Sequence, residues 1–271
     1  MFAVLKHELR SYFQSFTAYV FGTFLLVIVG IGSMLYNLQA AVSNFEYVLS
    51  FSSIIYVVIV PLLTMRVIAE ERRQKTDYLL YALPITMSQV VLGKYLALLV
   101  VFLIPMAVLC VYPCIFSLFG DVYLPVVYGS IFASFFMGAT LIAIGVFISS
   151  LTENQGLAAG IGVAIILLNY FSVSLSEYVS STAMGSLLTL VLLILLFGLL
   201  CRYLTKNPQL GFVISLGLTM LACVVYLIDQ SKFEGLLPAV MNQLSLFERL
   251  NTFVSGVFDM TAIVYYLSVI I

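Results

Sequence analysis

Long apolar runs, separated by short groups of charged residues, are the main pattern of this chain. A helix needs about 20 apolar residues to cross roughly 30 Å of hydrocarbon. The intervals between charges therefore predict seven membrane-spanning helices. They lie near 17–38 and 48–65, within 94–121 and 121–153, and near 156–176, 182–201 and 211–228. The pattern indicates an all-α integral membrane protein, a polytopic helical bundle forming a single transmembrane domain over 1–271.

Two further segments have the periodicity of helices that lie in the membrane interface. In residues 1–16, Phe2, Leu5 and Leu9 fall on one face, with Lys6 and Arg10 opposite. This spacing predicts an amphipathic helix on the membrane surface. The alternative is a plain positively charged start to the first span. Apolar residues spaced by three and four also predict an interfacial helix over 236–247, inside an extracytoplasmic loop at 229–259.

The last apolar segment, 260–271, is too short to span a bilayer. Its twelve residues reach only about 18 Å at the helical rise of about 1.5 Å per residue. We therefore expect the natural chain to continue beyond Ile271 and to complete an eighth transmembrane helix.

The distribution of Lys and Arg predicts the orientation. With the N-terminus inside, nine of the eleven Lys and Arg residues fall on the cytoplasmic side. Cytoplasmic loops carry an excess of these residues. The N-terminus is therefore predicted to be cytoplasmic.

Composition excludes several classes of function. The chain is 63% hydrophobic and 8% charged, with a formal net charge of -1, so it lacks the basic excess that nucleic-acid binding requires. No charged residue falls inside a predicted span, which argues against ion-coupled transport. With one His, four scattered Cys and no phosphate-binding loop, we expect no catalytic, metal or cofactor site. Any energy for work must come from a partner chain.

The densest charge lies in the predicted cytoplasmic segment 66–90. It has seven ionisable groups in the twelve residues 66–77. Thr76 and Asp77 can cap a short helix that presents Leu79 and Leu80, and Pro84 ends it. Thr86 with Gln89 forms a capping box that begins the third span. The segment is either a docking element for a partner or a solvated, positively charged loop.

Four stretches of the sequence resemble a known family. They are Leu63 to Lys94, Lys6 to Phe13, Ser150 to Gln155, and Leu244 to Arg249 with Asp259 and 265–268. Together they resemble ABC-2 type permeases of the gliding-motility and nitrous-oxide-reductase accessory branch, in an eight-helix variant of the type V exporter fold.

The resemblance implies a bacterial inner-membrane subunit of an ATP-binding cassette transporter. Its partners would be two copies of a cytosolic ATPase, which bind ATP and Mg²⁺, and a second permease subunit as homodimer or heterodimer. The residues that couple the permease to the ATPase would be Glu70, Glu71, Arg72, Arg73, Thr76, Asp77, Tyr78, Leu79 and Leu80. One departure is Lys75, where the family has glycine, so the turn into the coupling helix can differ.

The sequence gives less information about how the helices pack and about which substrate is moved. Gly156 and Gly160 form a Gly-x-x-x-Gly motif, which indicates either a sliding or a static helix contact. The few polar residues within the spans favour an amphipathic or lipid-like substrate and export.

Two alternative functions stay open. One is an ABC membrane subunit that transmits force to an extracytoplasmic accessory protein without moving a solute. The other is a channel or membrane scaffold that does not use ATP.

Overall fold

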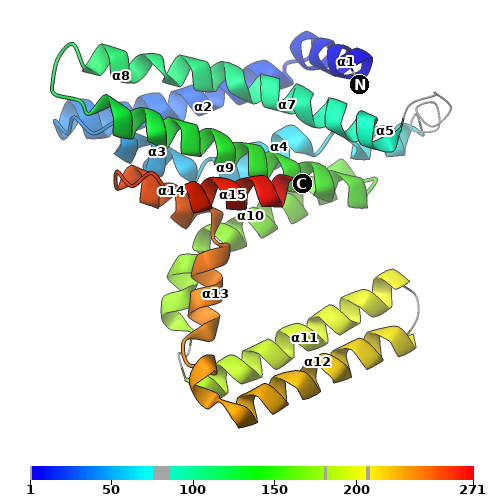
Figure 1. Ribbon diagram of the computed structural model, residues 1–271. Coiled ribbons are helices and arrows are strands. Elements are labelled where there is room, and N and C mark those ends of the chain that lie inside the picture. The colour runs from blue at the N-terminus through cyan, green and yellow to red at the C-terminus, as the bar shows by residue number, and fades with distance from the viewer. Residues whose placement is uncertain (1, 76–85, 180–181, 206–207) are drawn as a thin grey trace. The chain divides into compact units, whose positions relative to one another are not determined.

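The computed structural model describes residues 2–75, 86–179, 182–205 and 208–271, and within them the chain forms helices and no strands (Figure 1). This confirms the all-α prediction. The helices divide into two compact units. The first comprises Met1–Tyr170 with Leu246–Ile271, and the second is Phe171–Ser245.

The first unit contains most of the helices and is built around one long central helix. In chain order its elements are α1 (Phe2–Gln14), α2 (Thr17–Ser33), the π-helix η1 (Met34–Gln39), α3 (Glu46–Ser53), α4 (Tyr56–Thr64), α5 (Ala69–Gln74), α7 (Met87–Leu109), α8 (Val111–Phe116), α9 (Leu124–Leu151), most of α10 (Gln155–Tyr178), α14 (Leu246–Val254) and α15 (Met260–Ile270).

The central helix is α9, which packs against α3, α4, α7, α14 and α15. Glycine allows two of these approaches. A Cβ at Gly138 would lie 2.3 Å from Cζ of Phe102 on α7, and one at Gly145 would lie 2.2 Å from Oγ1 of Thr64 on α4. Real side chains do not come so close, so α7 and α4 can reach this distance from α9 only because both positions lack a side chain.

The second unit is a helical hairpin with short helices attached. α11 (Ala183–Thr205) and α12 (Pro208–Ile228) pack side by side (Figure 1), followed by the 3₁₀ turn η2 (Gln230–Phe233) and α13 (Leu236–Leu244). The hydroxyl of Tyr226 donates to Sδ of Met184 at 3.7 Å, which links the two long helices. Ser176, on the last part of α10, donates to Oδ1 of Asn242 on α13 at 2.9 Å.

Four helical stretches in the described residues are long and apolar enough to span a membrane. They are Thr17–Gln39, Met87–Phe116, Leu124–Leu151 and Gln155–Tyr178. A fifth is present if the bent pair Glu46–Ser53 and Tyr56–Gln74 forms one span, and three shorter apolar helices lie at Ala183–Leu195, Ser215–Ile228 and Met260–Ile270. The predicted positions of the spans are thus largely those of apolar helices, but a count of eight is not confirmed.

The second predicted span is broken rather than continuous. Its two helices meet at 61° across Ile54 and Ile55. A serine pair precedes the break, and the hydroxyl of Ser52 donates to the carbonyl of Leu49 at 3.0 Å. Serine hydroxyls that bond to the preceding turn favour helix bending, and Gly or Ser pairs are common at kinks.

Proline explains the joint in the third span. α7 ends at Leu109 and α8 begins at Val111. Pro113 has no N–H to donate to the carbonyl of Leu109, four residues earlier, and its ring crowds that carbonyl. The helix is therefore interrupted at Cys110.

The second predicted interfacial helix has different bounds. The sequence pattern joins 236–247, whereas the structure ends α13 at Leu244, leaves Ser245 extended and begins α14 at Leu246. Phe247 belongs to α14, where it is buried with Leu246 and Leu250. The apolar residues continue in register, but the extended backbone at Ser245 ends the helix.

Candidate coupling site

The segment that follows the second span begins as a short helix held by a residue from α9. Ser149 is fully buried. Its hydroxyl accepts hydrogen bonds from the backbone N–H groups of Ile68 at 3.2 Å and Ala69 at 3.1 Å. It donates one to the carbonyl of Met65 at 3.2 Å. One hydroxyl has one donor and two acceptor sites. Ser149 uses both acceptor sites on the start of α5 and its donor on Met65, the C-cap residue of α4. It caps that helix from outside its own sequence.

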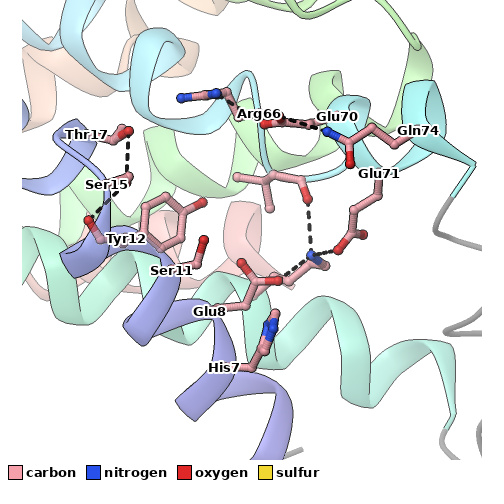
Figure 2. Close-up of a pocket in the computed structure, with 12 residues that line it drawn as sticks. His7, Glu8, Ser11, Tyr12, Ser15, Thr17, Arg66, Glu70, Glu71 and Gln74 are labelled. Atoms are coloured by element: carbon pink, nitrogen blue, oxygen red, sulfur yellow. Dashed lines mark hydrogen bonds and ion pairs between the residues drawn. The ribbon is translucent and has the colours of Figure 1, made fainter.

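Lys94 of α7 joins α5 to the N-terminal helix. Its ammonium group donates to Oε1 of Glu8 on α1 at 2.6 Å, to Oε1 of Glu71 on α5 at 2.6 Å, and to the carbonyl of Val67 at 3.2 Å. Figure 2 shows the carboxylates of Glu8 and Glu71 converging from their two helices. Three elements distant in sequence thus meet at one cation, and we call these residues the Lys94 cluster: Glu8, Val67, Glu71 and Lys94.

Burial makes the Lys94 cluster energetically important. The side chain of Lys94 is 3% exposed, that of Glu8 14% and that of Glu71 27%. An ammonium group has three donors, and all three are used. Removing one partner of a buried ion pair leaves an uncompensated charge, which costs about 3–5 kcal/mol. The three elements are therefore expected to stay together when any of them is displaced.

The position of Lys94 differs from the boundary that the charge intervals predict for the third span. Lys94 lies inside α7 and inside the apolar stretch Met87–Phe116. The sequence interval treats this lysine as the boundary of the span. The structure instead begins α7 at Met87, two turns earlier. Thr86 is the N-cap residue, as predicted, but its side chain makes no capping hydrogen bond.

A second ion pair lines the cavity beside the Lys94 cluster (Figure 2). Nε of Arg66 donates to Oε2 of Glu70 at 3.1 Å, and Gln74 donates to Oε1 of the same carboxylate at 3.2 Å. The cavity has a volume of about 620 Å³. It also borders Tyr12 of α1, whose pKa is raised by burial and by the nearby carboxylate of Glu8.

The turn after α5 takes the conformation that glycine favours. Lys75 has φ 56° and ψ 27°, and its N–H bonds to the carbonyls of Arg72 and Glu71. A left-handed residue commonly ends a helix, usually as glycine. Lys75 therefore adopts the left-handed conformation, although it stands where the resemblance implies glycine.

The predicted coupling residues are only partly within the described structure. Glu70, Glu71, Arg72 and Arg73 all lie on α5. Thr76, Asp77, Tyr78, Leu79 and Leu80 lie outside the described residues, as does Pro84.

Among the described residues, the predicted glycine motif makes no close helix contact. A Cβ at Gly160 would meet no atom within 4 Å, and one at Gly156 would meet only Oδ1 of Asn154, which caps the same helix. The close approaches are instead at Gly138 and Gly145. Packing of Gly156 and Gly160 against another chain stays a prediction.

The sequence pattern does not indicate the roles of three residues in this site. Ser149 is one serine at a helix end, Glu8 lies on the polar face of an amphipathic helix, and Lys94 marks the edge of an apolar run. Ser149 contacts Ile68 across 81 positions, and Lys94 contacts Glu8 across 86 positions and Glu71 across 23. Only these long-range contacts bring the three residues together around the start of α5.

Comparison with known families identifies the chain. A family described as ABC-2 family transporter protein matches residues 2–215, which include every element of this site. The chain belongs to the ABC-2 transporter family. A search of the curated proteins found no match. The chain is thus a multi-pass membrane protein and a permease subunit of an ABC transporter. In this family the ATPase is a separate cytosolic chain, and the permeases generally form dimers.

Proposed function

We propose that this ABC-2 subunit is an exporter permease in which α5 receives the movement of the ATPase and the Lys94 cluster passes it to α1 and α7. The observation that carries the proposal is the buried ammonium of Lys94, bonded at 2.6 Å to carboxylates of both α1 and α5. ATP and Mg²⁺ would be bound by the partner ATPase. The N-terminus and α5 would face the cytoplasm of a bacterial cell.

The geometry supports movement of these elements as one body. α5 has only six residues, too few to be stable alone. Ser149 holds its start to α9, and Glu71 holds its middle to α7 and α1. A push on α5 is therefore transmitted to buried groups of two membrane helices and one surface helix. Domain movements of this kind proceed as rigid-body shifts of packed elements.

An amphipathic substrate is part of the same proposal. The membrane stretches of the first unit contain few polar side chains, and the buried ones mainly bond to backbone, as Thr140 does to the carbonyls of Phe136 and Tyr266. Such helices offer little to a hydrophilic solute. They suit a substrate that moves along apolar helix faces.

The first test is association with the ATPase. The intact complex is purified in lipid with Leu79→Asp, which puts a charge on the proposed contact surface. The matched control is Leu118→Asp, a residue 80% exposed beyond α8 at the other end of the third span. Leu79→Asp should reduce the amount of co-purifying ATPase at least about tenfold, because a buried unpaired charge costs more than about 1.4 kcal/mol.

The outcome of this test is decisive in both directions. Wild type and Leu118→Asp should retain a separate ATPase at equal stoichiometry. A wild-type complex without any ATPase would point to the channel or scaffold alternative. Equal retention by both variants would show that the coupling segment is not the contact.

A further inference from the structure

An apolar groove runs along the first two turns of α2 and the facing side of α4. Its volume is about 420 Å³, within the range of about 300–1,000 Å³ that ligand pockets usually have. The groove is lined by Phe16, Thr17, Val20, Phe21, Phe24, Val58, Ile59, Leu62, Leu63, Met65 and Arg66. Thr17 and Arg66 also line the polar cavity beside the Lys94 cluster. An apolar and a polar hollow therefore adjoin at these two residues.

The length of the groove fits one acyl chain. From Thr17 to Phe24 the helix advances about 10 Å, which lies within the roughly 15 Å of hydrocarbon in one leaflet. A transmembrane helix of a second protein would need a groove along the whole of α2. The groove instead ends near Phe24, whereas α2 continues to Ser33.

Arg66 lies where the head group of such a lipid would be. Its side chain is 45% exposed and bonds to Glu70 through Nε alone. In the described part of the chain, no hydrogen bond uses its four Nη donors. Guanidinium groups bind phosphate oxygens by two parallel hydrogen bonds. The position of Arg66 at the polar end of an apolar groove is therefore suited to a phosphodiester.

The cavity beyond Arg66 favours a positive group over a second negative one. Its charged lining consists of three carboxylates and two cations, a net charge of -1 when His7 is neutral. A head group that is only anionic would be repelled there, and an ammonium that follows the phosphate would be attracted. Glu70 is the carboxylate nearest to Arg66 in the sequence. Its side chain is 32% exposed and lines this cavity.

We propose that this surface is a binding site for an aminophospholipid. One acyl chain occupies the groove between α2 and α4, the phosphate accepts hydrogen bonds from Arg66, and the primary ammonium faces the acid-lined cavity. The site goes beyond the proposed function, because lipid binding here does not require that the lipid be transported or that α5 couple to an ATPase.

The test measures bound lipid on the intact complex. The complex is purified in mild detergent, titrated with synthetic phosphatidylethanolamine or phosphatidylglycerol, and analysed by native mass spectrometry. Arg66→Gln should weaken phosphatidylethanolamine binding about tenfold, because it removes a charge-assisted hydrogen-bond donor. Leu62→Trp, which fills the groove, should weaken it similarly.

Matched controls separate this site from general lipid adhesion. Arg10→Gln alters an exposed arginine of α1, and Leu103→Trp alters a 51% exposed leucine of α7. Neither residue lines the groove or the cavity, so neither variant should change binding.

Three results would overturn the proposal. One is an equal loss of lipid in the control variants, and another is phosphatidylglycerol bound as tightly as phosphatidylethanolamine. The third is unchanged lipid binding in Leu62→Trp together with separation of two permease subunits, which would make the groove a protein interface. If Leu62→Trp does not fold, the comparison of Arg66→Gln with Arg10→Gln decides.

Discussion

Lys94 shows at the residue scale how one charge can be kept inside an apolar helix. Its ammonium loses water but gains two carboxylates and a carbonyl, so every donor is satisfied. Buried charges occur in proteins when they are paired and hydrogen-bonded in this way. The same condition makes the site intolerant of losing only one partner.

Substitution of Lys94 tests that reasoning. Lys94→Met should lower the free energy of unfolding by about 3–5 kcal/mol, because it removes the buried cation that the carboxylates of Glu8 and Glu71 both contact. Chemical unfolding of the purified subunit in detergent measures the change. The triple variant Lys94→Met, Glu8→Gln, Glu71→Gln should recover most of the loss. A triple variant as unstable as Lys94→Met would show that the ammonium acts by something other than charge compensation.

Glycines on α9 and α12 provide a second test at this scale. Gly138→Ala should destabilise by about 1–3 kcal/mol, because the new methyl group would overlap the buried ring of Phe102. Gly217→Ala on α12, where a Cβ would meet no described atom within 4 Å, is the control. It should be neutral or stabilise by up to about 1 kcal/mol, since it lowers the backbone entropy of the unfolded chain without a clash. Thermal unfolding compares the two. Equal destabilisation would contradict the packing of α9 on α7.

At the scale of elements, α5 depends on a cap from another helix. Six residues with no side-chain cap of their own cannot supply enough hydrogen bonds to form a helix alone. Ser149 compensates by accepting hydrogen bonds from two backbone N–H groups at the start of the helix, and it donates one to the carbonyl of Met65 at the end of α4. The arrangement links the end of α9 to the segment that leads into the predicted ATPase contact.

Adjacent serines on α9 allow a matched comparison. Ser149→Ala should speed amide hydrogen exchange in α5 about five- to thirtyfold, because losing a cap costs roughly 1–2 kcal/mol. Ser150→Ala removes only a bond to the carbonyl of Phe147 in the same helix and should leave α5 unchanged. Hydrogen exchange with mass spectrometry reads both. The cap has no role if the two variants behave alike.

The elements that the sequence predicts best are those with long apolar runs. α2 with η1, α9 and α10 lie close to their predicted ranges, and the polar residues 152–155 separate α9 from α10 as expected. The sequence does not predict the break at Ile54 and Ile55, because no charged residue interrupts the apolar run there. The interruption at Ser245 was missed because the apolar spacing continues through it.

The candidate site could be predicted only in part. Charge density identifies Glu70 to Arg73, which lie on α5 next to the cavity. The contacts of Lys94 with Glu8 and of Ser149 with Ala69 were not predictable, because they join positions 86 and 80 residues apart. Periodicity reports neighbours within one element, whereas these partners are set by how the helices pack.

At the scale of the whole molecule, the proposed coupling depends on three features of one ABC-2 permease. We propose that the charged segment contacts the ATPase. The Lys94 cluster joins α5 to α1 and α7, and α9 packs against α3, α4, α5, α7, α14 and α15. The chain supplies packed surfaces that can move, and the energy comes from the separate ATPase.

In the proposed mechanism, ATP binding moves α5, α7 and α1 together through the Lys94 cluster. Hydrogen exchange of the intact complex in lipid, with and without ATP and vanadate, tests it most directly. In wild type, α1, α5 and α7 should all change their protection on ATP binding. In the triple variant Lys94→Met, Glu8→Gln, Glu71→Gln, α5 should still respond while α1 and α7 do not. An unchanged response of α1 and α7 in that variant, with the ATPase still bound, would contradict the account.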